Sequence, residues 1–155
     1  MFPADVKGSP NHRDGALPGI KVLGSFVGED SWCSRQLLVR VERALRNLPA
    51  MCALRDCGPQ LNTAQQIRQM LVRYCANTTL VYFLRTMPPS VTAAAARRHD
   101  ELIERAFYSL VHSEGATTTE ITFALRQARL PVSLGGMGLT AMVDIGGFAG
   151  GGAGH

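Results

Sequence analysis

The chain has 155 residues, 46% of them hydrophobic and 18% charged, and its 16 Lys and Arg against 12 Asp and Glu give a formal charge of +4 at pH 7. This length suits one domain that buries roughly two thirds of the surface of its unfolded chain. No apolar run approaches the roughly 20 residues that span a bilayer, and the N-terminus lacks the apolar segment of a signal peptide. An intracellular protein is therefore expected, in the nucleus or the cytoplasm.

Arginine dominates the cations, since Lys7 and Lys21 are the only lysines. A guanidinium suits bidentate contact with phosphate, although a GC-rich coding sequence produces the same bias without any function. The cysteines match no common zinc framework, because four residues separate Cys52 from Cys57 and no His-x-x-x-His follows. Free thiols and no cofactor are expected, with Cys33 and Cys75 as small buried hydrophobes.

Residues 1–18 mix proline, glycine and polar residues without hydrophobic periodicity, which predicts a disordered leader. The stretch IKVLGSFVG, residues 20–28, alternates apolar and small residues and predicts a short strand or two strands around a turn. Gly24 and Gly28 permit backbone conformations that are closed to other residues.

Residues 30–49 predict the first helix, with Asp30 or Ser31 at its start and Pro49 at its end. The apolar residues at helical spacing are Leu37, Leu38, Val41, Leu45 and Leu48. Arg35, Arg43 and Arg46 lie away from this stripe. A basic face of this kind is either a solvated surface, which is the common case, or a contact for nucleic acid.

Residues 62–77 predict a second helix, in which Asn62 and Gln65 resemble a capping box. Its buried side is predicted to consist of Ala64, Ile67, Met70, Leu71 and Tyr74. The apolar stretch 78–87 then predicts a short helix buried between others.

Residues 90–113 predict the longest helix, with Ser90 as its N-cap. Its buried stripe is predicted to be Ala95, Leu102, Ile103, Ala106, Leu110 and Val111. His99 lies on the same side and is expected to be a hydrogen-bonded core residue.

Thr117 and Glu120 form a capping box for a further helix, which Pro131 ends. A short extended piece, a glycine turn and a weak apolar helix at 139–145 follow. Together these signals predict a mainly α fold of five or six helices with a short N-terminal β-hairpin and disordered termini. The helical domain is predicted to span 19–145, and a glycine-rich tail covers 146–155.

No phosphate-binding loop, dinucleotide fingerprint or catalytic triad is present in the sequence. A metal-dependent hydrolase using His99, Asp100 and His112 ranks last among the functional alternatives, because no spacing supports it.

Four phrases taken in order carry a resemblance: IKVLGSFVG, LVRYCANTTLVYFLRTMPPSV, ARRHDELI and LPVSLGGMGL. They resemble the region after the catalytic palm in reverse-transcriptase-like proteins of non-LTR retrotransposons. The resemblance runs from Gly19 to Ile145. It implies that residues 20–28 are a primer-grip hairpin and that the helices from Ser31 onward are thumb and connecting helices.

The resemblance also implies that Lys21 and Gly24 belong to the hairpin motif, and that cationic side chains of the thumb hold a template–primer duplex. Arg35, Arg43 and Arg46 are the candidates for that role. The palm with its catalytic carboxylates has no counterpart in this sequence, so a truncated, non-catalytic remnant without polymerase activity is expected. The alternative is a small helical module that binds another protein or self-associates through the face left by the missing palm.

Overall fold

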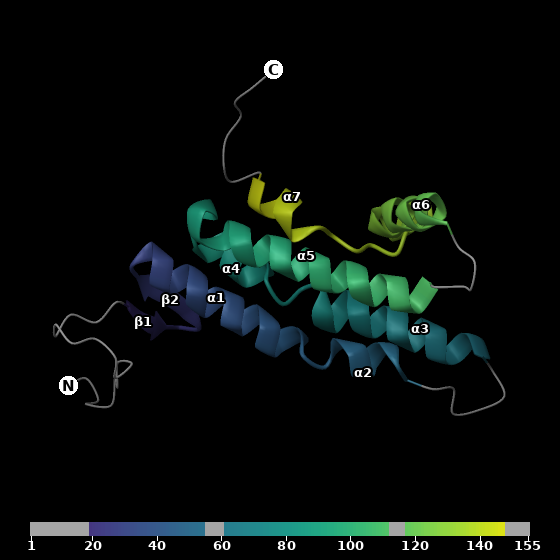
Figure 1. The fold of residues 1–155 in the computed structure, drawn as a ribbon, viewed down its shortest axis with the longest axis horizontal. Coiled ribbons are helices and arrows are strands. Elements are labelled where there is room, and N and C mark those ends of the chain that lie inside the picture. Colours follow the sequence, from purple (N-terminus) through teal and green to yellow (C-terminus); the bar gives the residue numbers. More distant parts are fainter. Residues whose placement is uncertain (1–18, 55–60, 112–116, 148–155) are drawn as a thin grey trace, which may run out of the picture.

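The computed structural model of the chain describes residues 19–54, 61–111 and 117–147, and these residues form a mainly helical fold with one two-stranded hairpin (Figure 1). The hairpin consists of β1 (Gly19–Val22) and β2 (Ser25–Gly28). The α-helices are α1 (Asp30–Leu45), α2 (Leu48–Cys52), α3 (Leu61–Leu71), α4 (Val81–Thr86), α5 (Pro89–Val111), α6 (Thr118–Arg129) and α7 (Met142–Gly147). A π-helical turn, Val72–Ala76, continues α3, and a 3-10 turn, Val132–Leu134, follows α6. The predicted fold class is confirmed.

Helices α1 and α5 lie side by side along the length of the molecule and run in the same direction (Figure 1). At their N-terminal ends, the Ser90 hydroxyl donates to Asp30 Oδ2 at 3.5 Å. Near the other end of α1, Arg98 Nε donates to Glu42 Oε1 at 2.6 Å. The remaining helices pack around this pair.

The core lies between α1, α5 and the elements that surround them. The buried side of α1 consists of Cys33, Leu37, Val41 and Leu45. The helical spacing predicted the burial of Leu37, Val41 and Leu45. From α5 the core receives Val91, Ala95, Ala96, Ile103, Ala106 and Phe107. Burial of such side chains contributes roughly 1.5–3 kcal/mol for each large aliphatic or aromatic residue.

An aromatic cluster fixes the hairpin to the helices. The strands pair antiparallel, with Lys21 opposite Phe26. Phe26 meets Trp32 of α1 edge-on and stacks on Phe83 of α4, each with ring centroids 5.9 Å apart. The two-residue turn between the strands has positive φ at both positions, 49° at Leu23 and 88° at Gly24, which suits the twist of a tight hairpin.

The predicted N-caps of three helices already lie inside the observed helices. The N-cap of α1 is Glu29, so Asp30 and Ser31 already lie inside the helix. Helix α5 begins at Pro89, ahead of the predicted cap Ser90, because proline is well suited to the first helical position. Helix α3 likewise begins at Leu61, ahead of Asn62.

Two other predicted boundaries are wrong. Helix α1 ends at Leu45, before Pro49. Pro49 instead lies in the first turn of α2, where proline is tolerated because a backbone N–H at that position forms no hydrogen bond within the helix. The piece predicted as extended after Pro131 is the 3-10 turn, and α7 starts at Met142, three residues later than predicted. The predicted leader, residues 1–18, and residues 148–155 of the predicted tail lie outside the described residues.

The predicted buried side of the second helix is wrong for three of its five residues, since only Ala64 and Leu71 are half-buried. Ile67, Met70 and Tyr74 are 47%, 57% and 56% exposed, while Val72 and Ala76 are buried. Ile67 and Met70 belong to the α-helical part, whereas Tyr74 lies in the π-helical turn, which takes more residues per turn than an α-helix. Cys75, in the same turn, is exposed, so it is not the buried hydrophobe that was predicted; Cys33 is buried.

The glycine turn before α7 has a steric cause. Gly135 and Gly138 have φ of 78° and 66°, which favour glycine. At Gly136, a Cβ atom would lie 2.0 Å from the carbonyl oxygen of Leu130, so no side chain fits. This turn brings the chain back across the molecule to α7.

Candidate nucleic-acid interface

The three candidate arginines share the exposed face of α1. Cys33, Leu37, Val41 and Leu45 define the opposite, buried face. Arg46 directly follows the helix and keeps helical angles, φ −58° and ψ −29°. At 3.6 residues per turn, Arg35, Arg43 and Arg46 fall within about 80° of one another around the axis. Along the helix axis, at a rise of 1.5 Å per residue, Arg35 lies about 12 Å from Arg43 and about 16 Å from Arg46.

These guanidinium groups make no ion pair with any part of the chain that the structure describes. Other arginines are engaged. Arg98 binds both Glu42 and Glu101, and these two hydrogen bonds raise the pKa of Arg98. Arg129 Nη2 lies 2.6 Å from Glu104 Oε1. The cations of the exposed α1 face are therefore available to an external anion.

The hairpin lies against the N-terminal end of α1. Lys21 is exposed on β1 and is paired across the hairpin with Phe26, which touches Trp32 in the first turn of α1. The register therefore puts Lys21 on a strand that is anchored to the helix of the three arginines. Gly24 stands in open space, since a Cβ atom added there would meet nothing within 4 Å, so its observed contribution is its positive φ in the turn.

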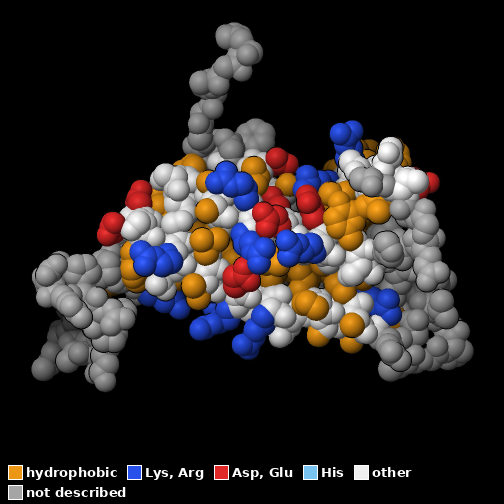
Figure 2. Space-filling view, viewed as in Figure 1, with side chains coloured by type: hydrophobic (Ala, Val, Ile, Leu, Met, Phe, Trp, Pro, Cys, Tyr) orange, Lys and Arg blue, Asp and Glu red, His pale blue; other side chains and the backbone are white. Residues whose placement is uncertain are grey.

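The cations do not form one uniform patch. Figure 2 shows Lys and Arg side chains spread along one face of the molecule, with Asp and Glu among them near its middle. Such mixing keeps the long-range potential small, so any attraction to a polyanion acts at short range.

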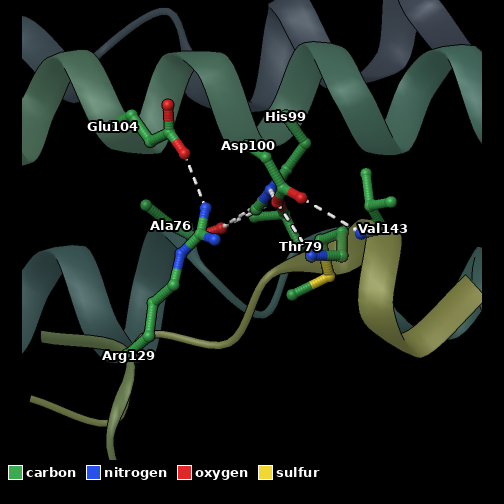
Figure 3. A network of polar contacts seen from close by, with 8 residues as sticks. Ala76, Thr79, His99, Asp100, Glu104, Arg129 and Val143 are labelled. Atoms are coloured by element: carbon green, nitrogen blue, oxygen red, sulfur yellow. Dashed lines mark hydrogen bonds and ion pairs between the residues drawn. The ribbon is translucent and has the colours of Figure 1, made fainter. Parts of the chain in front are cut away.

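His99 and Asp100, the candidates for a metal-dependent hydrolase, belong to a structural network (Figure 3). His99 is fully buried, as predicted for a core histidine, and its Nε2 lies 3.3 Å from the carbonyl oxygen of Ala76. Asp100 accepts hydrogen bonds from the backbone N–H groups of Met142 at 2.8 Å and Val143 at 3.0 Å. The third candidate, His112, lies outside the described residues.

A second contact holds the C-terminal segment to the π-helical turn. The side-chain amide of Asn77 is buried. In the orientation in which both its oxygen and its nitrogen have hydrogen-bond partners, it pairs with the backbone of Thr140. Its nitrogen then donates to Thr140 O and its oxygen accepts from Thr140 N, both at 3.0 Å. Sequence reasoning missed this residue, because nothing local to Asn77 indicates a partner 63 positions away.

Among the described residues, no group of three or more His, Cys, Asp or Glu side chains is placed to hold a metal ion. None of the helices in the described ranges is long and apolar enough to cross a membrane. No protein-family model, curated protein or solved structure matches this chain.

Proposed function

We propose that this chain is a non-catalytic helical unit derived from a reverse transcriptase, and that it binds a nucleic-acid duplex weakly through the duplex backbone. The observation that carries the proposal is the exposed α1 face. It presents Arg35, Arg43 and Arg46 with no ion pair to the described residues. Guanidinium groups bind phosphate oxygens through paired N–H donors.

Binding of this kind is independent of sequence, because phosphate contacts carry no base information. Three or four cations give a small footprint, so the expected Kd is roughly micromolar or poorer at physiological salt. The hairpin contributes Lys21, and the Leu23–Gly24 turn sets the direction of the strand that bears it.

The resemblance to the region after the palm is compatible with the packing. The phrase ARRHDELI contacts the segment that follows LPVSLGGMGL, since Asp100 binds the first turn of α7. Asp100 is thereby occupied as a helix cap. We expect no primer extension by the pure protein with any divalent cation, because two-metal phosphoryl transfer needs placed carboxylates and the family's catalytic acidic motif has no counterpart in this sequence.

The proposal is tested by titrating a short fluorescent duplex at low salt with the wild type and with the triple variant Arg35→Ala, Arg43→Ala, Arg46→Ala. A matched triple variant, Arg85→Ala, Arg97→Ala, Arg126→Ala, removes the same charge from exposed positions on α4, α5 and α6. We expect the first variant to lose most of the affinity and the second to keep it. No binding by the wild type, or equal losses in both variants, would refute the assignment.

A second candidate function is protein interaction, and a different surface favours it. Ile67, Met70 and Tyr74 form an exposed apolar stripe at positions i, i+3 and i+7 of the α3–π segment. Contiguous exposed apolar surface often marks a contact for another protein. This function requires no nucleic acid, so the two candidates are separable by experiment.

A further inference from the structure

A pocket lies where the C-terminal end of α1 meets α2 and the C-terminal half of α5. Its volume is about 380 Å³. The floor is apolar and is formed by Leu45, Leu48, Cys52 and Ala106. The thiol of Cys52 donates to Ala106 O at 3.8 Å, so the one sulfur in the floor is already directed at the protein.

Two guanidinium groups line the same pocket. Arg46 comes from the end of α1 and Arg105 from α5, and neither forms an ion pair with a residue of the described ranges. Glu42 also lines the pocket, but its carboxylate is bound to Arg98 at 2.6 Å. The Ser109 hydroxyl donates to Ala106 O at 2.7 Å and is likewise committed. An apolar floor is thus combined with two arginines that have no ion-pair partner among the described residues and with one carboxylate that is already bound to Arg98.

We infer that this pocket binds a small amphiphilic anion, a single apolar chain or ring that carries a carboxylate or phosphate group. The apolar part would replace water over the floor, with a gain of roughly 25 cal/mol for each Å² removed from water. The anionic group would bind Arg46 and Arg105, which approach from two different helices. The volume lies at the low end of the range of roughly 300–1,000 Å³ for small-molecule sites, so one short chain fits and a two-chain lipid does not.

This inference goes beyond the proposed function. Arg105 lies on α5, outside the nucleic-acid face of α1, and a change there tests the pocket alone. The loss of duplex binding in the α1 triple variant and the loss of anion binding in an Arg105 variant are therefore distinguishable results.

The experiment is a calorimetric titration of the full chain with dodecanoate below its micellar concentration, and in parallel with dodecyl phosphate, dodecanol and inorganic phosphate. Both amphiphilic anions should bind. Dodecanol should bind more weakly, and inorganic phosphate should give no measurable heat. Arg105→Gln should weaken dodecanoate by about tenfold, since a hydrogen bond between charged groups is lost. Arg126→Gln on α6 is the matched control and should bind like the wild type.

Ala106→Leu fills the floor of the pocket and should abolish binding of both dodecanoate and dodecanol, with an unchanged circular dichroism spectrum as the check on folding. Equal affinity of the Arg105→Gln and Arg126→Gln proteins for dodecanoate would overturn the inference. The inference would also be overturned if the protein bound anionic phospholipid vesicles but none of the free amphiphiles. That result would mean that Arg46 and Arg105 contact a membrane surface.

Discussion

His99 and Asp100 are neighbours in sequence with different structural roles. His99 fills the core, and its ring nitrogens face Ala76 O at 3.3 Å and Asp100 Oδ1 at 3.4 Å. Asp100 in turn accepts hydrogen bonds from two backbone N–H groups of α7. The helical spacing was enough to predict a core histidine. It could not predict the partners, because they lie 23 residues before His99 and 42 residues after Asp100.

Replacement of Asp100 by Ala should therefore destabilise the fold by about 2 kcal/mol, since a helix start loses the carboxylate that accepts from its first N–H groups. Asp144→Ala, an exposed change on the same helix, should cost about 0.5 kcal/mol or less. Urea unfolding of both variants measures the difference. Equal stabilities would mean that the contact between α5 and α7 contributes little.

At the scale of elements, apolar spacing predicted that the helices exist, while several of their ends and the inward side of α3 were predicted wrongly. Thr117 and Glu120 form the predicted capping box in full. The stripe of Ile67, Met70 and Tyr74 obeys an α-helical period, but the chain departs from that period at Val72. His99, from a distant helix, lies 3.3 Å from Ala76 O at the end of this turn, a contact that no local pattern indicates.

The capping box makes α6 sensitive to acid. Glu120 Oε2 accepts two hydrogen bonds of 2.8 Å, one from the backbone N–H of Thr117 and one from its hydroxyl. These bonds, the backbone one most, lower the pKa of Glu120 from its usual 4.5. A depressed pKa in the folded state means that this contribution is fully present above about pH 4.5 and is lost as the pH falls through the lower folded value.

We expect a carboxyl NMR titration to give Glu120 a pKa below 4.5, and Thr117→Ala to move it back toward that value. Glu120→Gln should remove the acid sensitivity of α6 in amide exchange. A Glu120 pKa at or above 4.5 in the wild type would show that the capping box is not formed in solution.

At the scale of the whole molecule, the two candidate functions lie on different elements. The outward side of α1 bears the arginines, and the α3–π segment bears the exposed apolar stripe. The sequence correctly placed Arg35, Arg43 and Arg46 off the buried face, since amphipathic spacing determines that directly. It gave no indication of the pocket with Arg46 and Arg105, because the two side chains come together only through packing of α1 on α5.

If protein interaction is the function, the apolar stripe should drive self-association at high concentration. Sedimentation equilibrium of the wild type should then show a mass that rises with concentration, and Met70→Lys should abolish the rise, because a charge in an apolar contact is costly to bury. Val143→Lys on α7, a similar change at an isolated exposed residue, is the control and should associate like the wild type. A wild type that stays monomeric would count against the stripe as a self-association surface.

The central claim is that the α1 face binds duplex phosphates, and its most direct test is the salt dependence of duplex affinity. Each phosphate contact contributes a slope of about −0.9 to a plot of log K against log salt concentration. The triple variant Arg35→Ala, Arg43→Ala, Arg46→Ala should reduce the magnitude of the wild-type slope by about 2.7 if all three arginines contact phosphate. The control triple variant on α4, α5 and α6 should leave it unchanged. The same slope in all three proteins would contradict the account.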